Sequence, residues 1–201
     1  CPCAPSSGNH LLYLNRRLII WNEFYGIATS SGRLPFPVYH LSTFKTLSHS
    51  KEHCCDAYQM DHNGYHGFDH WMRVLYNGRL LAGMENANIR VVELFCLLHD
   101  TQRRNERRDP LHGRRAARYA KSLRDVWFEI SDEEMNILTE ALKYHSDGYT
   151  RAEITVQVCW DADRLDLGRV GIKPAPHRLC TASAKSVDVL EAAYERSVKG
   201  E

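Results

Sequence analysis

The sequence predicts an all-α fold, a compact bundle of five or more helices. Apolar residues recur at helical spacing from about residue 51 onward, two capping boxes mark helix starts, and no stretch after residue 50 alternates with a period of two. The 201 residues are enough for one domain with a sizeable core, or for one domain and an appendage. We therefore expect a helical domain over residues 51–201 and an N-terminal extension over residues 1–50.

The first three predicted helices follow from the spacing of their apolar residues. Residues 66–83 place apolar side chains among polar ones at intervals close to three and four, which is the helical period. Residues 86–99 are so densely apolar that this helix must be nearly surrounded by protein, at the centre of the bundle. After an arginine-rich loop over residues 102–109, a third helix carries the small apolar residues of 116–123.

The later helices are predicted from their ends. Ser-x-x-Glu at residues 131–134 is a capping box and opens a helix over residues 132–145. Thr-x-x-Glu at residues 150–153 repeats the pattern and opens a helix that runs through Leu165. A last amphipathic helix is predicted over residues 181–197.

Charge and cysteine usage narrow the possible partners. The formal net charge is +1, which does not indicate any class of binding partner. Arginines are concentrated in residues 103–118, however, and they permit a local anionic ligand. The seven cysteines form no CxxC pair, which argues against a disulfide framework or a cysteine-rich zinc site and favours a reducing compartment such as the cytoplasm. No apolar run is long enough to span a membrane, and residues 11–21 lack the pattern of a signal peptide.

The predicted central helix ends in two adjacent side chains that can bind a metal, His99 and Asp100. Such a pair at the end of an apolar helix is costly to bury unless something occupies it, and we interpret that occupant as a metal ion. His66 and His70 are four residues apart and would project from one side of their helix. The further candidate ligands are His112, His145, Asp161, Asp163 and Asp166.

Histidine and carboxylate ligands without thiolates suit manganese, iron, nickel, cobalt, magnesium or zinc. Neighbouring residues on a helix point about 100° apart, so His99 and Asp100 reach one ion only at a helix end or facing a cavity. The apolar residues around Asp163 would turn its carboxylate inward. Asp161 and Asp166 compete with it, unless they are surface residues or helix caps.

These residues resemble the HD-domain metal-dependent phosphohydrolases, whose signature is H…HD…D spread over a helical bundle. The first histidine of that signature stands in H-x-x-[RQ]-V, which here begins at His70, and the doublet is His99-Asp100. The distal aspartate precedes Arg-Leu, as Asp163 does. The similarity covers roughly residues 55–175 and implies an HD-domain-like bundle in which these four side chains bind one or two divalent metal ions.

The resemblance implies a phosphomonoesterase or phosphodiesterase that acts on a nucleotide or another small phosphoester. The metal would lower the pKa of a bound water from about 15.7 toward 7 and polarise a phosphoryl oxygen. Asp100 or His66 would take the proton of that water, and a protonated His112 or His145 would steady the leaving oxygen or the equatorial charge. The arginines nearest in sequence for binding phosphate are Arg73, Arg103 and Arg104.

The departures from the family pattern bear on the substrate. Stringent-response nucleotide hydrolases of this superfamily carry Glu-Asp where this chain has Arg103 and Arg104, which disfavours guanosine tetraphosphate. The Gly-Tyr-Pro motif of the cyclic-di-GMP phosphodiesterases is absent. The alternatives are a non-catalytic metal- or nucleotide-binding module, and a nuclease that binds nucleic acid through the arginine-rich loop. The loop lacks the interleaved aromatics that stack on bases, so nucleic acid is the least favoured partner.

Overall fold

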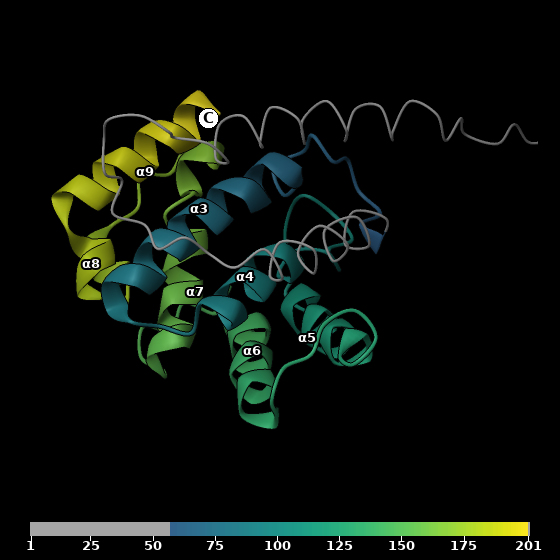
Figure 1. Ribbon diagram of the computed structural model, residues 1–201. Helices are drawn as coiled ribbons and strands as arrows, with labels where there is room; N and C mark the ends of the chain where they lie inside the picture. Colours follow the sequence, from purple (N-terminus) through teal and green to yellow (C-terminus); the bar gives the residue numbers. More distant parts are fainter. Residues whose placement is uncertain (1–56, 201) are drawn as a thin grey trace, which may run out of the picture. The chain divides into compact units, whose positions relative to one another are not determined.

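The computed structural model describes residues 57–200, and over this range the regular structure is helical (Figure 1). An isolated bridge between Arg124 and Phe128 is the only β-type pairing among the described residues. This confirms the predicted all-α bundle. The expected extension over residues 1–50 lies outside the described residues, so this division of the chain stays a prediction.

The helices follow one another along the chain. They are α3 (Phe68–Glu85), α4 (Ile89–Leu98), α5 (His112–Leu123), α6 (Asp132–Tyr144), α7 (Ile154–Arg164), the 3-10 helices η1 (Leu167–Val170) and η2 (Pro176–Arg178), α8 (Ala182–Lys185) and α9 (Val187–Lys199). The longest connection, over residues 99–111, joins α4 to α5. No helix among these is long and apolar enough to cross a membrane.

Helix α4 is the centre of the bundle, as its apolar sequence predicts. Eight consecutive residues, Val91 to Leu98, are buried, and the helix packs against α3, α6 and α7. Asn88 caps its N-terminus by accepting hydrogen bonds from the backbone N–H groups of Arg90 and Val91. Helix α5 packs on α6, while α9 packs on η1 and on α3 (Figure 1). The C-terminal end of α4 is therefore enclosed by several helices.

The helix ends confirm one capping prediction and correct another. Ser131 and Glu134 form the predicted capping box at the start of α6, with both reciprocal hydrogen bonds present. The predicted helix start at residue 150 is wrong. Helix α7 begins at Ile154, because Glu153 is itself the N-cap and its side chain accepts from the backbone N–H groups of Thr155 and Val156. The predicted last helix is interrupted at Ser186, whose extended backbone separates α8 from α9.

Candidate metal site

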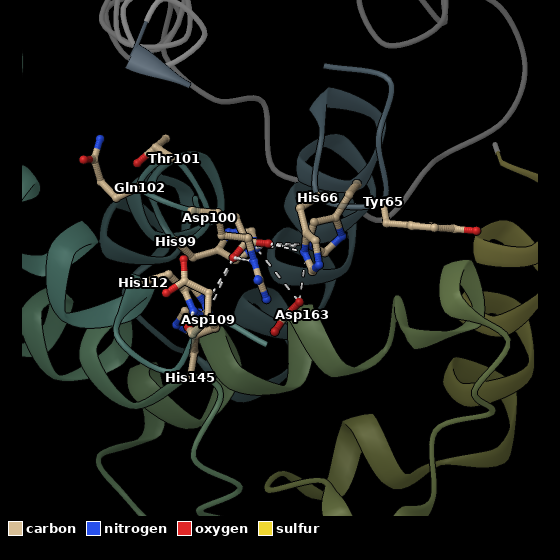
Figure 2. Close-up of polar contacts among 12 residues, drawn as sticks. Tyr65, His66, His99, Asp100, Thr101, Gln102, Asp109, His112, His145 and Asp163 are labelled. Carbon is tan, nitrogen blue, oxygen red and sulfur yellow. Dashed lines mark hydrogen bonds and ion pairs between the residues drawn. The ribbon is translucent and has the colours of Figure 1, made fainter. Parts of the chain in front are cut away.

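Polar side chains from three helices meet at the C-terminal end of α4 (Figure 2). His99 is the C-cap residue of α4, and Asp100 follows it directly. His70 comes from the first turn of α3 and Asp163 from the last turn of α7. The side chains of His70 and His99 are fully buried, that of Asp100 is 3% exposed and that of Asp163 is 17% exposed. We call these four residues the first ligand set.

The distances within the first ligand set suit coordination of one ion. His70 Nε2 lies 3.0 Å from His99 Nε2, 3.6 Å from Asp100 Oδ2 and 3.4 Å from Asp163 Oδ1. His99 Nε2 lies 3.6 Å from Asp100 Oδ2 and 3.9 Å from Asp163 Oδ1. Two ligand atoms that are each about 2.1 Å from the same ion lie about 3 to 3.5 Å apart at tetrahedral or octahedral angles.

The positions of the ring protons on His70 and His99 indicate what kind of group can lie between their Nε2 atoms. His99 Nδ1 is 3.0 Å from the carbonyl oxygen of Cys96, which only accepts, so Nδ1 carries the proton. His70 Nδ1 is 2.7 Å from the carboxylate of Asp166 and donates in the same way. In the neutral rings both Nε2 atoms therefore carry a lone pair and no proton, so they cannot hydrogen-bond to each other. A cation satisfies both, so the residues present fit a metal ion.

The charge state of the first ligand set also fits a metal ion. Burial lowers the pKa of His99 to about 3, so this imidazole is neutral near pH 7. Burial alone would raise the pKa values of Asp100 and Asp163, but the adjacent His99 lowers both below the ordinary range, together with the other neighbouring imidazoles at Asp100 and the charge of Arg169 at Asp163. Metal binding requires neutral imidazoles and ionised carboxylates, and this site supplies both.

A second group of nitrogen atoms faces the other oxygen of Asp100. His112 is the first residue of α5 and His145 is the C-cap of α6. Their Nε2 atoms are 2.7 Å apart and lie 3.3 and 3.8 Å from Asp100 Oδ1. Each Nδ1 faces a backbone carbonyl, of Asp109 and Leu142 respectively, so both Nε2 atoms again converge as lone pairs in the neutral rings. We call Asp100, His112 and His145 the second ligand set.

Gly113 explains how α5 and α6 approach so closely at the second ligand set. A Cβ atom at this position would lie 2.4 Å from the carbonyl oxygen of Leu142 and 3.2 Å from His145 Nδ1. Burial lowers the pKa of His145, but the nearby carboxylates of Asp100 and Asp163 and the hydrogen bond to the Leu142 carbonyl together outweigh burial and raise the pKa above the ordinary value. In the metal-free protein we therefore expect the pair His112 and His145 to share a proton.

His66 contacts Asp100 from outside the helix that was predicted to carry it. The sequence places it on a helix with His70, but α3 begins at Phe68 after the N-cap Gly67, so that placement is wrong. His66 is nevertheless buried, and its Nδ1 lies 2.7 Å from Asp100 Oδ2. Asp100 thus presents Oδ2 to His66 and the first ligand set, and Oδ1 to the second ligand set.

Asp166 supports the first ligand set from behind. Its carboxylate is 1% exposed, accepts from His70 Nδ1, and accepts from Arg73 Nε at 2.6 Å and Arg73 Nη2 at 3.2 Å. Arg169, which the sequence analysis did not single out, lies 3.7 Å from Asp166 and 3.9 Å from Asp163. Asp163 in the last turn of α7, Asp166 and Arg169 follow one another at three-residue intervals, and this spacing was the available signal for a shared role.

Asp161, the other competing aspartate, has a different environment. It accepts hydrogen bonds from the backbone N–H groups of Cys180 and Thr181 and from the Thr181 hydroxyl. Burial raises the pKa of Asp161 even though these donors oppose the shift. Asp161 therefore ties the segment before α8 to α7, while Asp163 faces the cluster.

The three arginines predicted to bind phosphate occupy different positions. Arg103 Nε lies 3.0 Å from Asp100 Oδ1, so its guanidinium is at the cluster. Arg73 is engaged with Asp166 behind His70. Arg104 is exposed, and its backbone N–H donates to Asp109. Phosphate binding by these arginines stays a prediction, and Arg103 is the one that contacts a candidate ligand.

Comparisons with known proteins bear on the fold. No protein-family model and no curated protein matches the chain. A predicted HD superfamily hydrolase from an uncultured Thermotogales bacterium superposes with a TM-score of 0.56 at 23% sequence identity, over 78% of this chain and 87% of its own. A protein from Lactobacillus plantarum gives a TM-score of 0.54 at 18% identity, over 81% and 94%. The chain therefore has the fold of a predicted HD superfamily hydrolase, and its buried histidine and aspartate cluster is compatible with the HD motif.

Proposed function

We propose that this protein is a divalent-metal-dependent phosphohydrolase that acts on a nucleotide or another small phosphoester. The observation that carries the proposal is the first ligand set, in which two imidazole lone pairs 3.0 Å apart face two ionised carboxylates. The fold shared with a predicted HD superfamily hydrolase supports the hydrolase class.

The first ligand set would bind the cation through His70, His99, Asp100 and Asp163. Two nitrogen and two oxygen donors suit manganese, iron, cobalt, nickel, magnesium or zinc. When bound, such a cation lowers the pKa of water and polarises a phosphoryl oxygen.

The residues around the first ligand set orient its imidazoles and move protons. Asp166 and the Cys96 carbonyl keep the ring protons of His70 and His99 on Nδ1, which leaves Nε2 available as a ligand. We infer that His66, which contacts Asp100 Oδ2, would take a proton from the attacking water. Arg103 places a guanidinium beside Asp100 Oδ1, where it would attract the substrate phosphate.

The second ligand set offers two imidazole nitrogens and one carboxylate oxygen. We infer that it holds a shared proton when one cation is bound and a second cation when metal is in excess. Either occupant places positive charge between the Nε2 atoms of His112 and His145, which are 2.7 Å apart. That charge would steady the leaving oxygen or the equatorial phosphate oxygens.

The alternative function is a non-catalytic metal-binding module. The near-complete burial of His70, His99 and Asp100 favours it, because structural sites are closed whereas catalytic sites keep an open position. Asp163 is the most exposed member of the first ligand set, so an open position for substrate would lie on its side of the site.

The test is metal-dependent phosphate release. The purified protein is stripped with a chelator, reloaded with each divalent cation, and assayed on a panel of nucleotides and an aryl phosphate. We expect turnover only with metal, lost in Asp100→Ala and kept in the matched control Asp188→Ala, an exposed aspartate in the first turn of α9. Tight metal binding without turnover of any phosphoester would establish the non-catalytic module instead.

A further inference from the structure

The guanidinium of Arg169 is held through two of its three nitrogen atoms. Arg169 lies in η1, the 3-10 helix that follows α7. Its Nε donates a hydrogen bond to the carbonyl oxygen of Tyr65 at 2.9 Å, and its Nη1 donates to the carbonyl oxygen of Asp166 at 3.0 Å. Nη2 makes no hydrogen bond with a described residue, and it is not shielded from solvent. The protons of Nη2 are therefore available to a ligand.

Nη2 of Arg169 lies beside the most exposed member of the first ligand set. It is 3.9 Å from Asp163 Oδ1, which is too long for a hydrogen bond. The side chains of Arg169 and Asp163 are 8% and 17% exposed, whereas those of His70, His99 and Asp100 are at most 3% exposed. A ligand that enters the first ligand set from solvent therefore approaches on the side where Asp163 and Arg169 lie.

The other two arginines at the cluster are engaged differently. Arg73 donates from Nε and Nη2 to the carboxylate of Asp166, so that carboxylate balances its charge. Arg103 donates from Nε to Asp100 Oδ1, the oxygen that faces the second ligand set. Both hydrogen bonds of Arg169, by contrast, are made to neutral carbonyl oxygens. Of these three arginines, Arg169 is the one that lies at the first ligand set without a hydrogen bond to a carboxylate.

The backbone that carries Arg169 is held by its neighbours. A Cβ atom at Gly168 would overlap the hydroxyl oxygen of Ser197 on α9, so η1 packs tightly against that helix. The hydrogen bond to the Tyr65 carbonyl joins η1 to a segment 104 positions earlier in the chain. The guanidinium is therefore positioned before a ligand binds, which lowers the entropic cost of binding.

The charges around Arg169 favour an anion that binds together with a cation. Asp163 and Asp166 lie 3.9 and 3.7 Å from its guanidinium, and both carboxylates repel an anion. A divalent cation bound by Asp163 would offset this repulsion, and guanidinium N–H groups match phosphate oxygens in charge and geometry. We propose that Arg169 binds a non-bridging oxygen of the substrate phosphate through Nη2, an inference that rests on the proposed phosphohydrolase function.

Calorimetric titration of the manganese-loaded protein with inorganic phosphate tests this role. A hydrogen bond between charged groups corresponds to about a tenfold to hundredfold difference in affinity, so Arg169→Met should weaken phosphate binding by that factor. Arg151→Ala removes an exposed arginine just before the N-terminal end of α7, the end opposite Asp163, and should bind phosphate like the wild type. Equal phosphate affinity in the wild type and Arg169→Met would overturn the proposal.

The affinity for metal distinguishes substrate binding from a purely structural role. Arg169→Met removes a positive charge 3.9 Å from Asp163, so manganese should bind at least as tightly as in the wild type. If Arg169 only held Asp163 or the segment at Tyr65 in place, the affinities for manganese and for phosphate would fall together, and the proposal would be wrong.

A second variant covers the case in which Arg169→Met does not fold, which thermal unfolding would show. Arg169→Lys keeps the charge, but one ammonium group cannot donate to two carbonyl oxygens and a phosphate in the same geometry. Weaker phosphate binding with unchanged manganese affinity in Arg169→Lys supports the proposal. Phosphate affinity equal to that of the wild type contradicts it.

A failure of the proposed function would look different. If the function holds, Arg169→Met should raise KM for an aryl phosphate about 10- to 100-fold, because the arginine binds the phosphate before the reaction as well as during it. If the wild type releases phosphate from no phosphoester with any metal, the proposed function fails, and the titration with inorganic phosphate still tests Arg169. Phosphate binding that is weakened in Arg169→Met supports the anion site, whereas no binding by the manganese-loaded wild type contradicts it.

Discussion

The two ligand sets share Asp100 but differ in charge and in what stands behind their imidazoles. The first ligand set contains a second carboxylate, Asp163, and its His70 is backed by the carboxylate of Asp166. In the second ligand set both imidazoles are backed by neutral carbonyls, and Arg103 lies 3.0 Å from the shared carboxylate oxygen. A carboxylate behind an imidazole increases its basicity as a ligand. The first ligand set should therefore bind a divalent cation more tightly, and the second should bind a proton or a weaker second cation.

The largest expected effect removes both ligand sets at once. Asp100→Ala deletes the side chain that contributes Oδ2 to one set and Oδ1 to the other. We expect metal uptake to be abolished, as measured by elemental analysis after dialysis against metal-containing buffer, while Asp188→Ala takes up metal like the wild type. Full metal occupancy in Asp100→Ala would contradict the ligand assignment.

Separate variants of each ligand set break the comparison directly. Asp163→Asn removes a charge found only in the first ligand set, whereas His145→Gln removes a nitrogen found only in the second. Calorimetric titration with manganese should show that Asp163→Asn loses the tight equivalent and that His145→Gln retains it. Equal loss of affinity in the two variants would mean that the sets do not differ as proposed.

Asp166→Asn tests the support behind the first ligand set. The amide keeps the shape of the side chain but weakens its hold on the Nδ1 proton of His70 and on Arg73. Removing such an outer partner lowers metal affinity about 10- to 100-fold. Metal titration reads the affinity, and thermal unfolding of the metal-free variant shows whether it folds normally. Unchanged metal affinity in Asp166→Asn would show that Asp166 does not support metal binding by His70.

The two sets should also differ in how pH affects the stability of the metal-free protein. The pKa of His99 is about 3 in the folded protein and about 6.5 in the unfolded chain, so the unfolded chain binds its proton first and stability falls as pH drops from 6.5 toward 3. The slope is up to about 1.4 kcal/mol per pH unit for one proton. The pKa of His145 is raised, so its contribution is complete below pH 6.5 and is lost as pH rises through the folded pKa.

Chemical denaturation across pH separates these two contributions. His99→Gln should flatten the acid side of the stability profile, and His145→Gln should flatten the side above pH 6.5. Identical profiles for the two variants would show that neither imidazole is perturbed in the way its surroundings indicate.

Arg103→Ala has the smallest expected effect and concerns substrate more than metal. Its guanidinium contacts Asp100 but is not a ligand, so metal content should change little. KM for a phosphorylated substrate should rise, because the arginine would no longer attract the phosphate. Steady-state kinetics on the metal-loaded variant measure this, and unchanged KM would leave Arg103 as a neighbour of Asp100 alone.

Much of the fold could be predicted because helical periodicity is a local property. The apolar run of α4 and the capping box of Ser131 lie within a few residues of sequence and are present as expected. The interruption at Ser186 was missed, because a single extended residue hardly disturbs the apolar spacing on either side of it. The start of α7 was misplaced because Thr150 and Glu153 are both capable caps, and the sequence does not choose between them.

The candidate site was partly predictable for the same reason. The residues His70, His99-Asp100 and Asp163 stand in recognisable local patterns, and the structure brings them together. The pairing of Arg73 with Asp166 joins residues 93 positions apart and has no local pattern.

The most direct test of the central claim is an anomalous diffraction map from crystals soaked in manganese. We predict a peak about 2.0 to 2.3 Å from Nε2 of His70 and of His99 and from the carboxylates of Asp100 and Asp163. A peak between His112 and His145 that appears only at higher manganese would match the weaker second ligand set. No peak at the first ligand set, in crystals where its side chains are ordered as described, would contradict the account.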